Sequence, residues 1–512
     1  MPDTDVLIAG AGPTGLVLAL WLARLGVRVR VVDKVAEPGT TSRALVVHAR
    51  TLEFYRQIGL ADAVVERGLQ FAAVNLWAKG RQIAHVYFGA IGVGISAFPY
   101  MVIFPQDEHE RLLIERLRGL GVAIERPVEL IAFDERGDRV VARLRMADGR
   151  EESCEAAYLA GCDGAHSNVR ELLGLQFSGS TYAHMFYVAD TEASGPIVNH
   201  ELHVALDEAD FVAGFPLQGQ GHVRLIGIVR DEATDDPDAL GWNDVSRGVI
   251  ERLGVIVGRV NWFSTYHVHH RVVSKFRRNR VFLLGDAAHI HSPVGGQGMN
   301  TGIGDAVNLA WKLSAVLQSR AHERVLDTYE PERIAFARRL VATTDRAFQV
   351  VTSNGPLARF VRLQVVPRVL PPLFASKAMR RFMFRTISQT SIQYRDSALS
   401  DGAAGTIHAG DRLPWVRFGE SDNYAQLTTL DWQAHVYGDA PTGISAICRA
   451  RGIPLHAFTW QDPLRNAGFE RNALYLVRPD GYVAFAQAGS DSTRIERYLD
   501  EWALRPRPGE LR

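Results

Sequence analysis

One short segment near the start of the chain constrains the fold more than any other, and it is a glycine-rich turn. The turn reads Gly10-Ala-Gly12-Pro-Thr14-Gly15. An apolar run of strand length, residues 5–9, precedes it, and a Leu- and Ala-rich run of helical length, residues 16–25, follows it. A second run rich in valine occupies residues 29–32. Strand, glycine turn, helix and strand in this order predict a βαβ unit, and therefore a parallel sheet that is buried on both faces.

The spacing G-x-G-x-x-G in this context is typical of a dinucleotide-binding turn. Its glycines permit a tight turn and allow a pyrophosphate to approach backbone N–H groups at the start of the helix. Asp33 ends the second strand, 18 residues after Gly15, where a carboxylate can accept hydrogen bonds from ribose hydroxyls. FAD and NAD both bind to this pattern, so the turn alone predicts a dinucleotide without naming it.

Two further motifs narrow the choice of cofactor. The first runs from Cys162-Asp163-Gly164 to Arg170, and the second from Val281 through Gly285-Asp286 to Asn300. Taken in this order, the glycine turn and the two motifs resemble those of the single-component FAD-dependent aromatic hydroxylases. The resemblance covers essentially the whole chain.

The resemblance implies a set of FAD contacts. Asp286 is expected to hold a hydroxyl of the ribityl chain, and Asp163 is associated with binding of both FAD and NAD(P)H. The glycine turn, with Asp33 and Lys34, is expected to hold the adenosine and pyrophosphate. Arg43 stands where similar enzymes place an arginine on the pyrophosphate, and Gln106 stands where they place a glutamine on the flavin. The segment after Asp286 offers helix N-terminal amides to the flavin N1–C2=O edge, and its expected contacts are Pro293, Gly295, Gly298, Met299 and Asn300.

The resemblance also implies an activity. NADPH or NADH would reduce FAD, O2 would add to form a C4a-hydroperoxyflavin, and an aromatic substrate, phenolic or polycyclic, would be hydroxylated. No second G-x-G-x-x-G occurs, so NAD(P)H is expected to bind only transiently. Two alternatives stay open at this point. One is an FAD-dependent oxidase, reductase or Baeyer-Villiger-type oxygenase of the same fold, and the other is a non-catalytic flavin-binding partner protein.

The order of elements predicts an α/β fold with three parts. A Rossmann-like FAD-binding domain with a helical extension is expected over residues 1–178 and 276–400. Short alternating runs predict an antiparallel-sheet substrate domain over residues 179–275. Residues 401–512 resemble the thioredoxin-like α/β extension of some of these hydroxylases, although the lone Cys448 departs from its CxxC motif. Residues 396–411, rich in Gly, Ala and Ser, are expected to form a linker.

Aromatic residues of the antiparallel sheet are the candidates for a dry substrate cavity, which the chemistry needs because water would discharge the oxidant. Phe211, Phe215 and Tyr266 are the predicted lining residues. Trp262 and Phe263 are further candidates, but neighbouring side chains on a strand face opposite sides, so about half of such a set points elsewhere. The general base is unassigned, with His48 and Tyr266 as candidates.

Composition excludes other classes of function. Lysine and arginine number 57, and so do aspartate and glutamate, so we expect neither nucleic acid nor membrane as a partner. The apolar run over residues 6–23 follows acidic residues and is broken by glycines and a proline, which does not fit a membrane span. Residues 346–395 carry nine basic residues and no acidic one, which we interpret as short helices with a solvated arginine face.

Cysteine and histidine content excludes further classes of protein. Three cysteines cannot form a disulfide framework, and the histidines at 267, 269, 270, 289 and 291 lack the spacing of a metal site. We therefore expect a cytoplasmic protein without a metal, whose partners are a small aromatic or polycyclic substrate, O2 and NAD(P)H. The sequence leaves a homodimer open.

Overall fold

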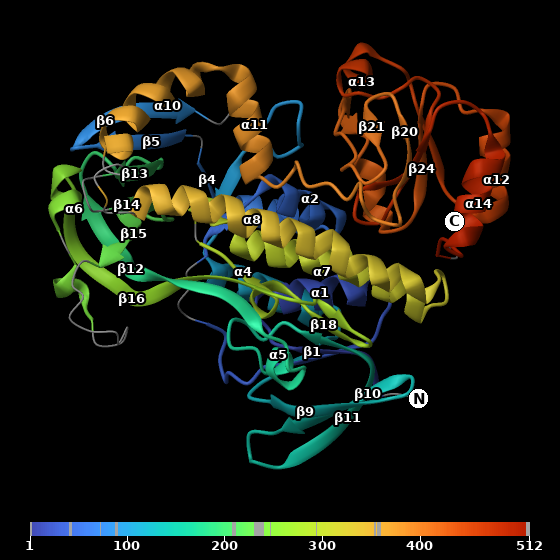
Figure 1. Cartoon of the computed structure of the whole chain (residues 1–512), viewed down its shortest axis with the longest axis horizontal. Coiled ribbons are helices and arrows are strands. Elements are labelled where there is room, and N and C mark those ends of the chain that lie inside the picture. The colour runs from blue at the N-terminus through green and yellow to red at the C-terminus, as the bar shows by residue number, and fades with distance from the viewer. Residues whose placement is uncertain are drawn as a thin grey trace.

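The computed structural model holds three packed units (Figure 1). It describes residues 3–39, 44–71, 73–87, 91–206, 211–229, 240–245, 247–292, 294–352, 355 and 360–507. Two of the units are built around large sheets, and the third is the C-terminal domain, which lies at one end of the molecule next to α2 (Ala49–Gln57).

The first sheet is the predicted parallel one. Strand β1 (Thr4–Ala9) pairs in parallel with β2 (Val29–Val32) on one side and with β11 (Glu151–Gly161) on the other. The predicted βαβ unit is therefore confirmed. The sheet's outer strands are β8 (Ile124–Glu125), β17 (Arg277–Arg278) and β18 (Val281–Leu283), and a hairpin of β9 (Glu129–Arg136) and β10 (Arg139–Arg145) extends β11.

Helices cover this parallel sheet. The glycine turn leads into α1 (Pro13–Arg24), which packs against α4 (Gln106–Gly119) and α7 (Gly298–Leu317). Trp21 of α1 and Trp311 of α7 are almost completely buried, so both helices belong to the main core. The other helices of this unit are α3 (Ala61–Arg67), α5 (Asn168–Leu172) and α8 (Tyr329–Thr352).

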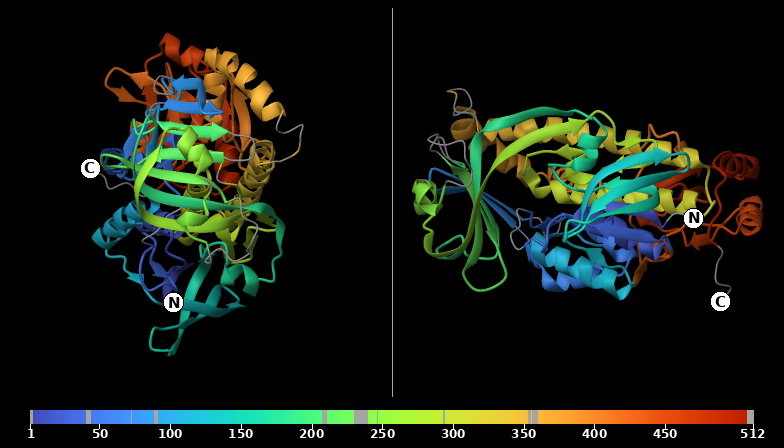
Figure 2. Two further views of the ribbon diagram at one scale, coloured as in Figure 1. Left: turned by 90° about the vertical axis from the view of Figure 1, so that its left-hand side faces the viewer. Right: turned by 90° about the horizontal axis from the view of Figure 1, so that it is seen from below.

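The second sheet is mainly antiparallel, as predicted. Its long central strands β12 (Phe177–Ser194) and β16 (Ile256–Val273) curve strongly (Figure 2). The remaining strands are β19 (His289–Ile290), β15 (His222–Val229), β14 (Phe211–Pro216), β13 (Leu202–Leu206), β5 (Ala73–Ala78) and β6 (Arg81–Tyr87). The last two lie within residues 1–178, the range that the sequence assigns to the FAD-binding domain, and β5 joins through a parallel pair with β13.

Smaller elements surround the second sheet. Helix α6 (Gly248–Arg252) packs against β14. A three-stranded sheet of β3 (Val46–Val47), β7 (Met101–Ile103) and β4 (Leu69–Phe71) lies between the two large sheets and shares an apolar cluster with the second. The basic segment forms two short helices, α10 (Val366–Ala375) and α11 (Lys377–Ile387). Helix α10 packs on β6.

The C-terminal domain has its own mixed sheet. Strand β24 (Gln433–Tyr437) runs parallel to β25 (Leu455–Phe458) and antiparallel to β26 (Leu474–Val477), which forms a hairpin with β27 (Val483–Gln487). The expected linker is wrong in part, because β20 (Asp401–Ala404) pairs with β27, and backbone hydrogen bonds need no strand-forming side chains. The remaining elements are β21 (Ile407–His408), β22 (Arg417–Phe418), β23 (Ser421–Asp422), α12 (Thr442–Arg451), α13 (Asp462–Asn466) and α14 (Ser492–Glu501). The thioredoxin-like assignment stays a prediction.

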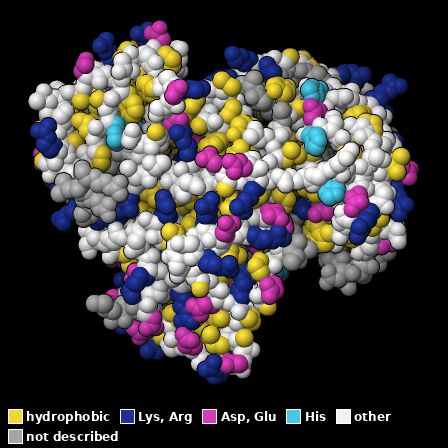
Figure 3. Space-filling model, turned by 180° about the vertical axis from the view of Figure 1, so that it is seen from behind, with side chains coloured by type: hydrophobic (Ala, Val, Ile, Leu, Met, Phe, Trp, Pro, Cys, Tyr) yellow, Lys and Arg dark blue, Asp and Glu magenta, His cyan; other side chains and the backbone are white. Residues whose placement is uncertain are grey.

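Figure 3 shows the face opposite to that of Figure 1, where basic and acidic side chains are interspersed. Within the described ranges, none of the helices combines the length and the apolar character that a membrane span requires.

Candidate active site

The glycine turn packs where β1, β2 and β11 end. Gly10 has a φ of +102°, and a side chain there would overlap the Cys162 carbonyl at the end of β11. A side chain at Gly15 would overlap the Gly10 carbonyl oxygen. Gly12 is different, because no described atom lies within 4 Å of the position that its Cβ would take. Gly10 and Gly15 thus shape the turn, and Gly12 leaves an open approach to the start of α1, where helix amides face outward.

Thr14 brings two of the motifs together. A Cβ on Gly285, in the second motif, would lie 2.6 Å from Thr14 Oγ1, and a Cβ on Gly302 of α7 would overlap the same oxygen. The close packing of Thr14 therefore depends on glycine at both positions. Sequence separation hides this contact, since some 270 residues lie between Thr14 and Gly285.

Asp33 lies beside the glycine turn and binds it. Its Oδ2 accepts a hydrogen bond from the Ala11 N–H at 2.7 Å, and its Oδ1 accepts one from the Val35 N–H at 2.9 Å. Arg126 approaches the same carboxylate at 3.5 Å and donates to the Ala11 carbonyl at 3.2 Å. Arg126 belongs to none of the motifs, and no signal in the sequence marks it. An open glycine turn, a helix N-terminus and an acid at the end of β2 fit the pyrophosphate and ribose of a dinucleotide.

The other predicted cofactor residues occupy varied positions. Asp286 is exposed in a short turn directly after β18, and Gln106 opens α4, where its Nε2 donates to Glu110 at 2.8 Å. Lys34 is exposed next to Asp33. Arg43 and Pro293 lie outside the described residues.

Asp163 is tied to its own loop. Its Oδ1 accepts a hydrogen bond from Ser167 Oγ at 2.5 Å, and its Oδ2 accepts one from the Val169 N–H at 3.1 Å. Ser167 in turn caps α5. Burial raises the pKa of the Asp163 carboxyl. In this structure Asp163 orders the turn between β11 and α5.

Asn300 and His48 join the start of α7 to the start of α2. Asn300 Oδ1 accepts from the His48 N–H at 3.0 Å and from Thr51 Oγ1 at 2.8 Å. Asn300 Nδ2 donates to the carbonyls of Val46 and Gly296. Since each hydrogen-bonding atom of the amide has protein partners, the Asn300 side chain holds the two helices together.

His48 also supports the glycine segment before α7. Its Nε2 lies 2.9 Å from the Gly295 carbonyl oxygen, so this nitrogen carries the proton and donates. Complete burial lowers the pKa of His48 to about 4. The imidazole is therefore neutral near pH 7. Its hydrogen bond anchors the segment that contains Gly295, Gly298 and Met299 to the start of α2.

The predicted substrate residues lie in two rows on one face of the second sheet. The row that contains Tyr266 also holds Phe211, Phe186 and Ile228, and the row that contains Phe215 also holds Trp262, Asp190 and Arg224. We call these eight residues the aromatic face. Phe211, Phe215, Trp262 and Tyr266 are only partly buried.

Phe263 lies on the opposite side of the sheet, where its ring stacks on Tyr187 with centroids 6.1 Å apart. Four of the five candidates therefore share one face and only Phe263 faces away, fewer than the expected half. Tyr266, Trp262 and Phe215 share an apolar cluster with Val46, whose carbonyl binds Asn300. The aromatic face is thus connected with the segment before α7.

Asp190 and Arg224 form an ion pair that no sequence motif indicates. Arg224 Nε and Nη2 donate to the two carboxylate oxygens of Asp190 at 2.6 and 2.7 Å. The Arg224 side chain is 3% exposed, and its guanidinium lies 5.6 Å from the centroid of the Trp262 ring. Only the register of β12, β15 and β16 brings these residues together.

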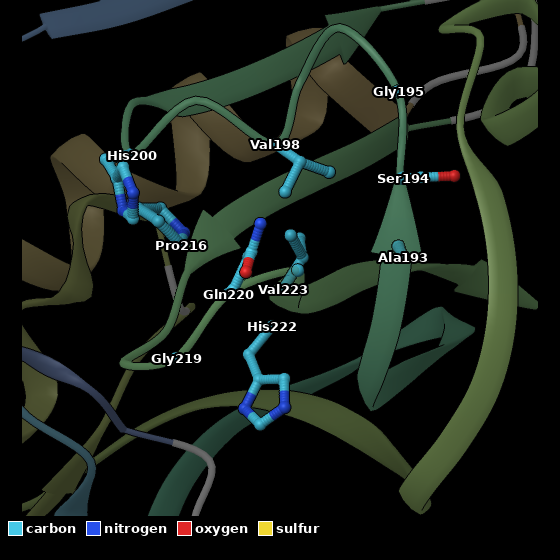
Figure 4. A pocket seen from close by; sticks show the side chains of 11 residues that line it. Ala193, Ser194, Gly195, Val198, His200, Pro216, Gly219, Gln220, His222 and Val223 are labelled. Atoms are coloured by element: carbon cyan, nitrogen blue, oxygen red, sulfur yellow. The ribbon is translucent and has the colours of Figure 1, made fainter.

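A hollow of about 390 Å³ opens elsewhere on the second sheet (Figure 4). Its lining comes from the last residues of β12 and β14 and the first residues of β15, and it includes Pro216, His222 and Val223. None of the three motifs contributes to it. In the portion of the chain that the structure describes, no three His, Cys, Asp or Glu side chains are arranged to hold a metal ion.

Comparison with known proteins agrees with this geometry. Residues 3–344 match the family model described as FAD binding domain. The chain is 40% identical to a 6-methylpretetramide 4-monooxygenase of Streptomyces rimosus, over 99% of this chain and 95% of that protein. It is 30% identical to a rifampicin monooxygenase of Rhodococcus hoagii over 98% of both chains. The solved structure of an anhydrotetracycline hydroxylase from Streptomyces rimosus covers 98% of this chain and 99% of its own, with a TM-score of 0.78 and 28% identity.

The fold and the glycine turn together define a flavoprotein. The chain belongs to the FAD binding domain family, whose model matches more than half of its length. The predicted FAD cofactor and the predicted flavin-dependent monooxygenase are both confirmed.

Proposed function

We propose that this enzyme hydroxylates a phenolic compound with several fused rings, with NADPH or NADH as reductant. The aromatic face carries the proposal, because the partly buried rings of Phe215, Trp262 and Tyr266 share an apolar cluster with Val46, whose carbonyl binds Asn300 of α7. Bound and reduced FAD supplies the chemistry, activation of O2 for transfer of one oxygen atom to an electron-rich ring.

The protein's own residues bind, orient and exclude water. The glycine turn and Asp33 hold the dinucleotide, while Asp286 and Gln106 hold the flavin portion. The N-terminus of α7 offers partial positive charge, which stabilises negative charge that develops on a reduced cofactor. Phe215, Trp262 and Tyr266 present apolar rings that keep water away from the substrate.

The charges on the aromatic face favour a large neutral substrate over a small phenolic acid. A carboxylate would need an unpaired cation, but two hydrogen bonds commit Arg224 to Asp190. The name of one solved relative, an anhydrotetracycline hydroxylase, supports fused rings as the substrate class.

His48 is unsuited to the role of general base. A base with a pKa of about 4 takes a proton from a phenol poorly at neutral pH. We assign His48 instead to positioning, through its hydrogen bond to the Gly295 carbonyl.

The test is turnover of a tetracyclic phenol and of 4-hydroxybenzoate, each with NADPH or NADH under 18O2. We expect the tetracyclic product to gain one 18O atom at a ring carbon, with little product from the acid. A product that loses two hydrogens without gaining 18O would favour an oxidase, and 18O inserted beside a carbonyl would favour a Baeyer-Villiger oxygenase. Bound FAD that neither nicotinamide reduces would favour the non-catalytic partner.

A further inference from the structure

The C-terminal domain contacts helices α2 and α7, whose first residues meet beside the glycine segment before α7. Helix α2 begins next to His48, and α7 begins with Gly298, two residues before Asn300. The His48 N–H and the Asn300 side chain join these two starts at 3.0 Å. The bodies of both helices extend to the C-terminal domain (Figure 1).

Helix α2 binds that domain through buried charge. Glu53 accepts two hydrogen bonds from Arg412, at 2.9 and 2.6 Å, and others from Arg50 at 2.8 Å and Ser96 at 2.6 Å. Burial alone would raise the pKa of Glu53, but the two guanidiniums hold it below its usual value. Removing one partner from such a buried group costs far more than removing a surface ion pair.

The turn between β26 and β27, residues 478–481, contacts both helices at once. Arg50 of α2 donates to the Asp480 carbonyl at 2.6 Å, and Gln57 donates to the Pro479 carbonyl at 3.0 Å. Trp311 of α7 donates through Nε1 to Asp480 Oδ2 at 3.0 Å. Asp480 is 1% exposed, so these are interior contacts.

A second buried cluster fixes the same turn. Arg478 donates to Glu332 of α8 at 2.9 and 3.0 Å and to Asp480 at 2.6 and 3.0 Å. Lys312 of α7 donates to Glu332 at 2.8 Å. The turn, α7 and α8 therefore form one network of opposite charges, with its polar groups paired.

We propose that the turn at residues 478–481 sets the position of α2 relative to α7, and that Asp480 is thereby a positioning residue for FAD. The C-terminal domain acts as a brace on the flavin site through packed helices. The alternative use of such a domain, thiol exchange, is disfavoured because Cys448 is 2% exposed and burial raises its pKa to about 11. The inference concerns cofactor binding and so does not depend on the substrate proposed above.

The experiment compares Asp480→Asn with Tyr475→Phe. Asp480→Asn keeps the shape but removes the charge that faces Arg478. Tyr475→Phe removes a buried hydroxyl that binds the Ala404 carbonyl and the Glu470 N–H, inside the C-terminal domain and away from α2 and α7. For each purified holoenzyme we would measure release of FAD on dilution, the visible flavin spectrum, hydrogen peroxide formed per NADPH oxidised, and thermal unfolding.

We expect Asp480→Asn to weaken FAD binding at least tenfold, to shift the flavin spectrum and to increase peroxide formation. Tyr475→Phe should lower the unfolding temperature while FAD affinity stays within twofold of the wild type. Equal loss of FAD in both variants, or a destabilised Asp480→Asn protein with wild-type FAD affinity and spectrum, would overturn the proposal.

If Asp480→Asn fails to fold, Trp311→Phe is the substitute. It removes the Nε1–H bond to Asp480 and shrinks the ring beneath the Arg478 guanidinium, but it keeps an aromatic ring against Trp432, whose centroid lies 5.6 Å away. We expect about threefold weaker FAD binding, and an unchanged affinity would count against the brace.

Discussion

At the end of β1, backbone atoms determine which residues the glycine turn can hold, whereas aromatic side chains shape the surface of the second sheet. Gly10 and Gly15 leave no room for a methyl group. Phe215, Trp262 and Tyr266 are only partly buried, so their surroundings can adjust. Substitutions in the glycine turn should therefore act on stability or on FAD, and substitutions on the aromatic face should act on the substrate.

The two sides also differ in how their charges are used. On the nucleotide side, Asp33 binds the N–H of Ala11 and shapes the turn. On the aromatic face, Asp190 and Arg224 neutralise each other within the sheet. The first arrangement fixes the backbone of the glycine turn, and the second leaves this ion pair without net charge on the aromatic face.

The largest effect should follow from Gly15→Ala. The new methyl group would overlap the Gly10 carbonyl oxygen, so the β1–α1 turn must open. We expect the free energy of unfolding to fall by about 3 kcal/mol. Urea unfolding of the FAD-free protein measures this, and a stability within about 0.5 kcal/mol of the wild type would contradict the packing described for the turn.

Gly12→Ala should separate cofactor binding from folding. The methyl group would enter open space, and Gly12 has a φ of −77°, which alanine adopts without strain. We therefore expect wild-type stability without FAD, together with FAD binding weakened at least tenfold, about 1.4 kcal/mol. Titration of the FAD-free protein with FAD is the measurement, with Gly15→Ala as the contrasting variant. Unchanged FAD affinity would show that the pyrophosphate does not approach Gly12.

Acid should weaken the hydrogen bond by which His48 supports the glycine segment before α7. The pKa of His48 is about 4 in the folded protein, against an ordinary value of 6.5. Between these values the unfolded chain binds a proton that the folded protein does not, so stability falls as pH drops from 6.5 to 4. We expect His48→Gln to remove roughly 3 kcal/mol of that pH dependence.

Urea unfolding of the wild type and of His48→Gln at several pH values tests this, with the half-exposed His408 changed to Gln as a control. Parallel stability curves for the wild type and His48→Gln would refute the assignment.

Phe215→Ala should act on the substrate and leave the cofactor in place. Loss of a partly buried ring on the aromatic face should raise the KM for a fused-ring phenol about tenfold, while FAD affinity is kept. Phe263→Ala is the matched variant on the other side of the sheet. It should cost stability and leave the KM nearly unchanged. Steady-state kinetics and FAD titration of both variants make the comparison, and equal effects on KM would mean that the substrate does not bind at the aromatic face.

The local elements near the motifs could be predicted because their signals are short-range. The βαβ unit follows from alternating apolar runs and a glycine turn, and the helix after Asp286 follows from its apolar spacing. The Gly- and Ala-rich stretch that contains β20 was misjudged for the converse reason. Its strand exists through pairing with β27, some 80 residues away, and not through its own side chains.

The candidate site shows the same division. Asp33 and the glycines were predictable from spacing. Arg126, the Asp190–Arg224 pair and the saturation of Asn300 were not, because each depends on which strands and helices become neighbours. The membership of β5 and β6 in the second sheet likewise depends on a parallel pairing across more than 120 residues.

By itself, the sequence determined that this chain builds a dinucleotide turn and resembles an FAD-dependent hydroxylase, because those signals are periodic or closely spaced. Only the tertiary structure decided that Asn300 binds the start of α2 and that Asp480 reaches α2 and α7 together. The physical reason is that buried polar groups must find partners, and packing, not sequence distance, determines which partners are near.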